Sequence, residues 1–217
     1  KTWKAHHIAE EKGLKTKVGL TFRYAPAMMY MCHLIEQGFV GEPFIFNGYE
    51  QNSQFIDPDE PLTKRDLIPP YESEEIKVSS LEGYGAPIID LSLMFMNSNL
   101  ARVVGVLKNF IPYRTDYDGT KIRTNIDDGD IYLGEYESGA ICSVQSSYVT
   151  VGNYPGLEAR VYGSEGALIC RLVEEKGVYQ TLKQATPDQV EFEPVDIPES
   201  FFPPGHVEGE PWPSMFY

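Results

Sequence analysis

The sequence has few cysteines, few basic residues and no long hydrophobic run. Its three cysteines, Cys32, Cys142 and Cys170, lie far apart in apolar segments, which indicates buried thiols in a reducing compartment. The 18 lysine and arginine residues are outnumbered by 32 aspartates and glutamates, so the formal net charge is −14. Such a surface repels phosphate backbones and anionic lipids. No apolar run approaches the roughly 20 residues of a membrane span, and the polar start is unlike a signal peptide. We therefore expect a cytoplasmic protein without nucleic-acid or membrane partners.

Metal ligands at a recognisable spacing are also lacking. His6 and His7 are adjacent in a predicted helix, so they project about 100° apart and cannot chelate one ion together. A calcium loop needs ligands at its first, third and fifth positions and a glycine at its sixth, a spacing that the aspartates between residues 116 and 130 do not have. We predict no metal site and interpret these aspartates as an acidic loop that leads into a strand. The glycines of "YGSEGAL" lie between two predicted strands, so this segment predicts a hairpin turn rather than a phosphate-binding loop.

The pattern of apolar residues divides the chain into a helical first part and a strand-rich second part. The first part predicts helices over 2–12, 26–37 and 87–97, short strands over 17–22 and 42–51, and a long irregular segment over 53–82. From residue 101 onward, alternating runs separated by turns predict an antiparallel sheet. The expected strands are 101–113, 127–138, 140–151, 156–164, 166–175, 177–185 and 189–197. We predict an α+β fold, with a large, mostly antiparallel open sheet and helices on one of its faces.

Two residues stand where this fold places ligands. Arg23 follows the predicted strand over 17–22, and ligands bind beyond the carboxyl ends of strands in open α/β sheets. Its guanidinium fork can hold a hydroxyl, a carboxylate or a phosphate, although it can equally form a surface ion pair. Tyr84 precedes the helix that starts near Pro87, where a phenol can transfer a proton. Tyrosine is also an ordinary packing residue, so both interpretations stay open.

Read together, several segments resemble the family of glucose–fructose oxidoreductase, inositol dehydrogenase and the rhizopine-catabolism proteins (Gfo/Idh/MocA). The matching segments occur in the family's order over about residues 1–172: "GLKTKVGLTFRYAP", "LIEQGFVGEPFIF", "GYGAPIIDLSLMFM", "RVVGV", "NIDDGDIYLGEYESGAICSVQSS" and "ARVYGSEGALICRL". The resemblance implies a Rossmann domain for NAD or NADP, followed by an α/β domain whose open sheet carries the substrate side of the cleft and the oligomer interface. It also implies hydride transfer between nicotinamide and a sugar, cyclitol or related polyol.

This chain holds only part of that pattern. The glycine-rich dinucleotide fingerprint and the Glu-Lys-Pro motif with the family's catalytic lysine are absent from it. We therefore interpret residues 1–24 as the end of a Rossmann domain, and residues 25–217 as a substrate-binding and oligomerisation domain truncated at its C-terminal end. We expect this fragment alone to be inactive, and the full-length protein to bind NAD or NADP and to form a homodimer or homotetramer through the open sheet.

The sharpest departure from the family is "GYGAPIIDL". The resemblance aligns Gly83 with the family's reactive aspartate and Pro87 with its histidine, and neither residue can transfer a proton. Tyr84 is our catalytic candidate, while Asp90 is expected to support the structure.

Substrate binding is predicted for Arg23 and, more weakly, for the polar residues Gln51, Asn52, Tyr113 and Arg114. Two alternatives to a dehydrogenase stay open. One is a non-catalytic binding or assembly protein on the same scaffold, and the other is an NAD-using lyase or hydrolase.

Overall fold

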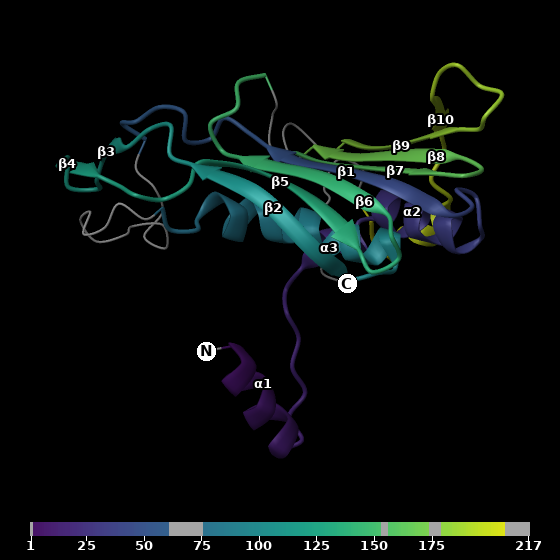
Figure 1. The fold of residues 1–217 in the computed structure, drawn as a ribbon, viewed down its shortest axis with the longest axis horizontal. Coiled ribbons are helices and arrows are strands. Elements are labelled where there is room, and N and C mark those ends of the chain that lie inside the picture. Colours follow the sequence, from purple (N-terminus) through teal and green to yellow (C-terminus); the bar gives the residue numbers. More distant parts are fainter. Residues whose placement is uncertain (1, 61–75, 153–155, 174–178, 207–217) are drawn as a thin grey trace.

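The computed structural model describes residues 2–60, 76–152, 156–173 and 179–206. In these ranges one large sheet is covered by helices on one side, and an N-terminal helix stands apart from it (Figure 1). The helical elements are α1 (Thr2–Glu11), η1 (Thr21–Tyr24), α2 (Pro26–Glu36), η2 (Leu81–Gly85), α3 (Ala86–Met96) and η3 (Glu199–Phe201). The strands are β1 (Pro43–Gln51), β2 (Leu100–Lys108), β3 (Tyr113–Thr115), β4 (Lys121–Arg123), β5 (Gly129–Tyr136), β6 (Ile141–Ser147), β7 (Gly156–Gly163), β8 (Ala167–Val173), β9 (Tyr179–Ala185) and β10 (Glu193–Val195).

The sheet has the order β10-β9-β8-β7-β1-β6-β5-β2, with eight strands in the described residues. Its neighbours pair antiparallel, except that β1 and β6 run parallel with Ile45 opposite Ile141 and Gln51 opposite Ser147. Helices α2 and α3 lie against the same side of it (Figure 1). The predicted α+β fold, with its mostly antiparallel open sheet and helices on one face, is thus confirmed.

The core lies between these two helices and the covered face of the sheet. Strand β7 alternates buried and partly exposed residues, as a strand with one covered face must. Gly48 lets α3 approach β1, because a Cβ added there would lie 2.6 Å from Ile88 Cγ1. The three cysteines are free, and Cys142 and Cys170 are buried as predicted, whereas Cys32 is only partly buried. Side chains that fill the core include Met28, Met31, Phe46, Leu91, Phe95, Val144, Val161 and Leu172.

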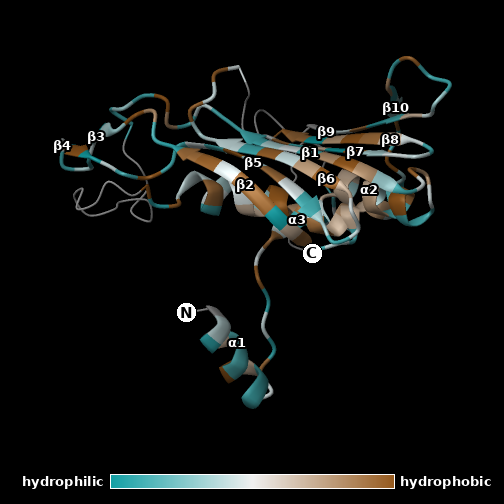
Figure 2. Ribbon diagram, viewed as in Figure 1, coloured by the Kyte–Doolittle hydropathy of each residue, from teal (hydrophilic) through white to brown (hydrophobic). Residues whose placement is uncertain are grey.

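The strand predicted over residues 17–22 does not form. Residues 14–20 have no regular structure and most are exposed, and Thr21–Tyr24 is a 3-10 turn that packs against α2 and α3. A strand needs a neighbour to accept and donate its backbone hydrogen bonds, and none of the described strands lies beside this segment. Helix α1, which is mostly hydrophilic (Figure 2), is joined through this stretch to η1 and α2 on the helix-covered side of the sheet (Figure 1). The domain boundary near residue 24 stays a prediction.

The predicted acidic loop leading into a strand is found for Asp127 and Asp128, which directly precede β5, while Asp130 lies within that strand. All three are buried. Asp127 and Asp128 are 0% exposed and Asp130 is 5% exposed, whereas Asp118 is at the surface. The segment before them contains the short hairpin β3–β4, which the sequence pattern did not predict. The first predicted strand after α3 ends at Lys108, and the last one is reduced to Glu193–Val195. The predicted turn in "YGSEGAL" is confirmed between the antiparallel strands β7 and β8.

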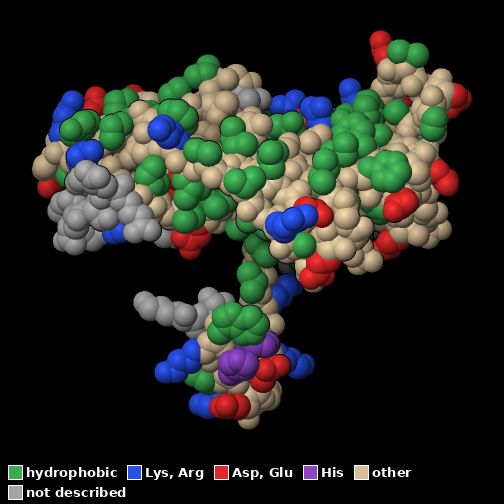
Figure 3. Space-filling model, in the orientation of Figure 1, with side chains coloured by type: hydrophobic (Ala, Val, Ile, Leu, Met, Phe, Trp, Pro, Cys, Tyr) green, Lys and Arg blue, Asp and Glu red, His purple; other side chains and the backbone are tan. Residues whose placement is uncertain are grey.

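The second face of the sheet is left open and carries many apolar side chains. Tyr132 and Tyr136 of β5 point into the core, so Ile131 and Leu133 point to the opposite face. Leu133 lies across from Val104 of the edge strand β2, and Ile131 from Val106. Hydrophobic side chains are visible over β2 and β5 in Figure 3. We call this set the open-face patch: Ile45 (38% exposed), Val104 (69%), Val106 (65%), Ile131 (52%), Leu133 (56%) and Ile141 (51%).

Candidate active site

The segment that carries Tyr84 is a single π-helical turn, Leu81–Gly85, which leads directly into α3. Pro87 lies in the first turn of α3, as predicted. It has no N–H to donate to a carbonyl four residues earlier, and its ring would clash with that carbonyl, which accounts for the wider turn before it. Gly85 presses the turn onto the sheet, because a Cβ there would lie 3.2 Å from Ser146 Oγ of β6. Such π turns occur frequently at functional sites.

Tyr84 meets the segment that follows β1. Its hydroxyl donates a hydrogen bond to Gln54 Oε1 at 2.6 Å, and its ring lies 5.7 Å from the ring of Tyr148. The Gln54 backbone N–H in turn donates to Asn52 Oδ1 at 2.9 Å. Asn52 is 1% exposed, and its Nδ2 donor is buried without a hydrogen-bond partner. The structure therefore brings Tyr84 and Asn52 of the sequence-predicted residues into one group.

Gln51 and Asn52 are neighbours in the chain but serve opposite faces of the sheet. Gln51 Nε2 donates to Gln145 Oε1 of β6 at 3.3 Å, and Gln145 lies opposite Ile131 of the open-face patch. Gln51, Gln145, Lys108 and Phe110 line a hollow of about 400 Å³. Because successive side chains of an extended strand alternate in direction, Gln51 and Asn52 cannot both face Tyr84.

Arg23 is held by Asp90 of α3. Its Nε donates to Asp90 Oδ2 at 2.8 Å, and its Nη2 donates to Asp90 Oδ1. This hydrogen bonding to Asp90 raises the pKa of Arg23, against a smaller opposite effect of burial. The pair ties η1 to α3, which agrees with the structural role expected for Asp90. A ligand can reach Arg23 through the exposed part of its side chain, which is 36% accessible.

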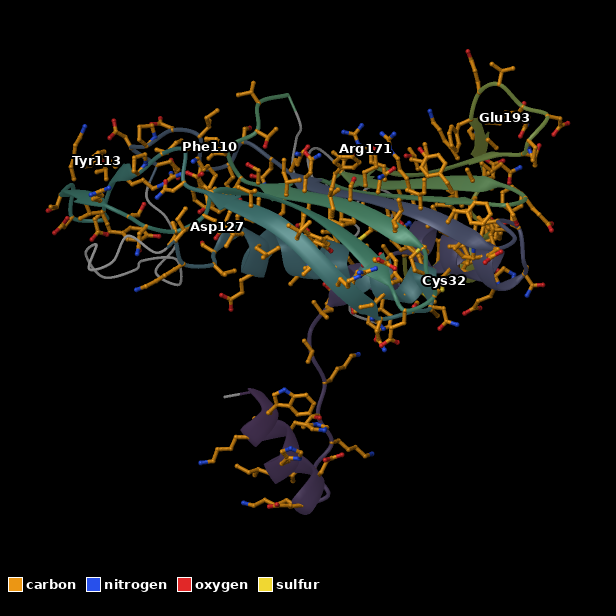
Figure 4. The ribbon with its side chains drawn as sticks, in the orientation of Figure 1. Cys32, Phe110, Tyr113, Asp127, Arg171 and Glu193 are labelled. Carbon is orange, nitrogen blue, oxygen red and sulfur yellow. The ribbon has the colours of Figure 1, made fainter. Side chains whose placement is uncertain are left out.

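Tyr113 and Arg114 point in different directions from β3. Tyr113 is 62% exposed on the hairpin (Figure 4). Arg114 is 2% exposed, donates to the Phe55 carbonyl at 2.8 Å and pairs with Asp128 Oδ2 at 3.4 Å. Its guanidinium also lies 5.8 Å from the centre of the Tyr148 ring. Arg114 thus packs against Tyr148 and stabilises the residues around it. Because it is buried, it can affect a bound ligand only through those residues.

Three buried aspartates next to this group were missed as functional candidates. Asp127 binds the backbone at the start of the Tyr84 turn, and Asp128 binds the loop after β2. Asp130 accepts a hydrogen bond from Ser146 Oγ, and burial, with a smaller contribution from the nearby Asp127 charge, raises its pKa to about 6. Asp130 also reaches a hollow of about 350 Å³ between α3 and β2. One signal could have found it: Asp130 shares the alternating inward positions of the apolar residues Tyr132 and Tyr136.

Comparison with known proteins identifies the scaffold. The model of the GFO/IDH/MocA C-terminal domain matches residues 28–169, more than half of the chain. The chain belongs to the GFO/IDH/MocA family. Among curated proteins, it is 21% identical to levoglucosan dehydrogenase of Pseudarthrobacter phenanthrenivorans, over 76% of this chain and 44% of that protein.

Solved structures of this family share the fold. An NAD-binding oxidoreductase from Klebsiella pneumoniae matches with a TM-score of 0.75 and 21% identity, over 89% of this chain and 50% of that one. An inositol dehydrogenase homologue from Azotobacter vinelandii, complexed with NADH and myo-inositol, matches with a TM-score of 0.68 and 20% identity, over 88% and 45% of the two chains. The chain therefore spans about half the length of the proteins it matches.

The glycine-rich segment of this GFO/IDH/MocA chain does not form a dinucleotide-binding loop. The "YGSEGAL" glycines form a hairpin between β7 and β8, so they offer no helix N-terminus for a pyrophosphate. Within the described ranges, no three His, Cys, Asp or Glu side chains gather closely enough to hold a metal ion. None of the described helices has the length and apolar character needed to cross a membrane.

Proposed function

We propose that this domain supplies the substrate side of the active site in an NAD(P)-dependent oxidoreductase that acts on a sugar, a cyclitol or a related polyol. The observation that supports it is the group at the N-terminal end of α3, where the Tyr84 phenol and the buried Asn52 amide converge on Gln54. In the proposed oxidation of a secondary alcohol to a ketone, a bound nicotinamide would supply the hydride acceptor, and the hydroxyl proton would leave to a base of the protein. Reduction is the reverse.

The residues have distinct proposed roles in this reaction. Tyr84 exchanges the proton with the substrate hydroxyl, because Gly83 and Pro87 cannot titrate. Asn52 offers its unpaired Nδ2 donor to a second hydroxyl; a buried donor without a partner costs free energy that a ligand oxygen would recover. Arg23 binds a more distant hydroxyl while it stays paired with Asp90. The cofactor would be held by a Rossmann domain, of which residues 1–24 would be the last part.

The open-face patch supports a homodimer or homotetramer as the working form. Six apolar side chains that are 38–69% exposed lie on neighbouring strands, and contiguous exposed apolar surface marks interaction sites. A second copy of the sheet can cover this face without approaching Tyr84, which lies on the helix side. A cytoplasmic location stays a prediction, based on the free cysteines.

Nucleotide binding tests the proposal most simply. The full-length protein is titrated with NAD, NADP and their reduced forms by calorimetry, and a panel of sugars, anhydrosugars and cyclitols is then screened for reduction of the bound nucleotide. We expect binding of one nucleotide pair and turnover of at least one polyol. Binding of neither nucleotide would favour the alternative of a non-catalytic binding or assembly protein, which is also consistent with Gly83 and Pro87, since neither residue can titrate. Nucleotide binding with elimination or hydrolysis of the polyol would favour the lyase or hydrolase.

A further inference from the structure

The turn that carries Tyr84 is capped by a side chain from a segment distant in the sequence. Asp127, just before β5, accepts backbone hydrogen bonds from Ser80 at 3.2 Å and Leu81 at 2.9 Å, and a further one from Ser79. These amides open η2, where Ser80 itself provides no side-chain cap. The first amides of a helix lack partners within the helix, and a carboxylate there also interacts favourably with the helix dipole. Asp127 thus provides the cap that the local sequence lacks.

Backbone contacts hold the same junction in register. The Asp127 N–H donates to the Lys77 carbonyl at 3.0 Å, and the Lys77 N–H donates to the Asn125 carbonyl at 2.8 Å. The Asp127 carbonyl accepts the Tyr148 hydroxyl at 2.9 Å. Since the Tyr148 ring packs on Tyr84, Asp127 reaches Tyr84 by two routes, through the backbone of its turn and through the neighbouring ring.

The adjacent Asp128 also binds backbone amides, but it faces another segment and pairs with Arg114 at 3.4 Å. It is equally buried and accepts backbone hydrogen bonds from Phe110 at 2.7 Å and Ile111 at 2.9 Å. Figure 4 shows Asp127 near the end of the sheet that carries Phe110 and the hairpin of Tyr113. The two aspartates can therefore be compared directly: the Asp127 carboxylate binds the Tyr84 turn, and the Asp128 carboxylate binds the loop after β2.

We propose that Asp127 is a positioning residue for Tyr84. Asp127 caps the π turn and anchors Tyr148, and so holds the Tyr84 phenol at the angle that the reaction needs. The inference rests on the proposed role of Tyr84. Burial raises the pKa of Asp127, and the hydrogen bonds from the Leu81 and Ser79 amides counter that rise. An asparagine at position 127 keeps the volume of the side chain but loses part of its hydrogen bonding to the turn. The turn then loses its fixed geometry, while the sheet is retained.

A spectroscopic experiment tests the positioning without any need for turnover. The full-length protein is labelled with 3-fluorotyrosine, and the signal of Tyr84 among the 14 tyrosines of this chain is assigned with Tyr84→Phe. Asp127→Asn should shift or broaden this signal. Asp128→Asn is the control: it removes an equally buried carboxylate that also pairs with Arg114, so it should lower the unfolding midpoint at least as much, yet move the Tyr84 signal much less because Asp128 does not bind the Tyr84 turn. A Tyr84 signal unchanged in Asp127→Asn, or moved equally by Asp128→Asn, would overturn the proposal.

Kinetics with the substrate found in the screen separate positioning from general damage. Asp127→Asn should lower kcat by about a hundredfold, as small misplacements of reacting groups do, with the nucleotide Kd unchanged. In a Tyr84→Phe background the same change should alter kcat by less than about twofold, because residues that act through one another are not additive. Equal effects in both backgrounds would contradict the proposal. If no polyol is turned over, the proposed function fails, while the fluorine signal still decides whether Asp127 positions Tyr84.

A second variant covers the case in which Asp127→Asn does not fold. Tyr148→Phe removes only the hydroxyl that donates to the Asp127 carbonyl, and keeps the ring that packs on Tyr84. We expect the Tyr84 fluorine signal to move by a smaller amount in this variant. A signal identical to that of the parent protein would count against the route through Tyr148 and, with Asp127→Asn unfolded, against the proposal.

Discussion

The two faces of the sheet differ in what their side chains are free to do. On the helix-covered face, residues such as Phe46 and Val144 are 0% exposed and make up the core, and Asp127 and Asp128 near its end each accept at least two backbone hydrogen bonds. On the open face, apolar residues such as Val104 and Leu133 are 69% and 56% exposed. The covered face is therefore suited to hold a reactive group in place, and the open face to bind another surface. Gln51, the last residue of β1, and Asn52, which follows it, show how one step along the chain moves from one face to the other.

The largest difference between the faces should appear in stability. Phe46→Ala removes a fully buried ring, so we expect it to lower the free energy of unfolding by about 3–5 kcal/mol. Leu133→Ala, on the open face, should lower it by less than about 1 kcal/mol in the dissociated protein. Urea unfolding at a protein concentration that disfavours association measures both. Similar losses for the two variants would mean that the open face is covered within one chain.

The next difference concerns catalysis. Asn52→Ala removes the buried amide beside Tyr84, and we expect kcat/KM to fall by about a hundredfold, about 2.7 kcal/mol in transition-state stabilisation. Gln51→Ala, which affects the open face, should change it by less than about threefold. Both are measured with the full-length protein and the polyol that it turns over. A greater loss for Gln51→Ala would place substrate on the open face, in the hollow lined by Gln145 and Phe110.

A third test uses the buried carboxyl of the covered face. Burial raises the folded-state pKa of Asp130 to about 6, above the value of about 3.9 in an unfolded chain. The folded state therefore binds the proton more tightly, and the stability contributed by this group is complete below pH of about 4 and is lost as the pH rises through about 6.

Asp130→Asn removes this dependence. Relative to wild type, the variant should gain about 2–3 kcal/mol of stability between pH of about 4 and 7, as measured by urea unfolding across that range. Asp118→Asn, at the surface, serves as the control and should not show this gain. Parallel stability curves for wild type and Asp130→Asn would show that Asp130 titrates normally.

The smallest predicted effect concerns assembly. Val104→Lys places a charge within the open-face patch, on the edge strand β2, and we expect it to weaken self-association by about tenfold or more, about 1.4 kcal/mol. Sedimentation at several concentrations measures it, and Lys108→Ala at the end of the same strand is the control. An unchanged association constant in Val104→Lys would assign the oligomer interface to another surface.

The sequence predicted the elements that follow from a local pattern of residues, and it missed the features that depend on partners distant in the sequence. Helices α2 and α3 and the strands β5–β9 follow from periodicity, and the place of Pro87 follows from its missing N–H. The strand expected over 17–22 failed because a strand depends on a neighbour. Arg114 was predicted to bind substrate from its polar character, whereas its contacts with the Phe55 carbonyl and Asp128 depend on the fold.

The burial of Asp127 and Asp128 could not be read locally for the same reason. Their partners are backbone amides near residues 80 and 110, and no sequence pattern marks an amide as unpaired. Tyr84 was found from its place before the helix, whereas its contacts with Gln54 and Tyr148 required the fold.

The central claim is that the turn before α3 carries the proton-transferring group of an NAD(P)-dependent oxidoreductase. The most direct measurement is the turnover of Tyr84→Phe in the full-length protein, compared with Tyr117→Phe, which alters a phenol that is 54% exposed on a loop. We predict that Tyr84→Phe lowers kcat by about a hundredfold or more with unchanged nucleotide affinity, and that Tyr117→Phe has no such effect. Unchanged turnover in Tyr84→Phe would contradict the claim and remove Tyr84 from the chemistry.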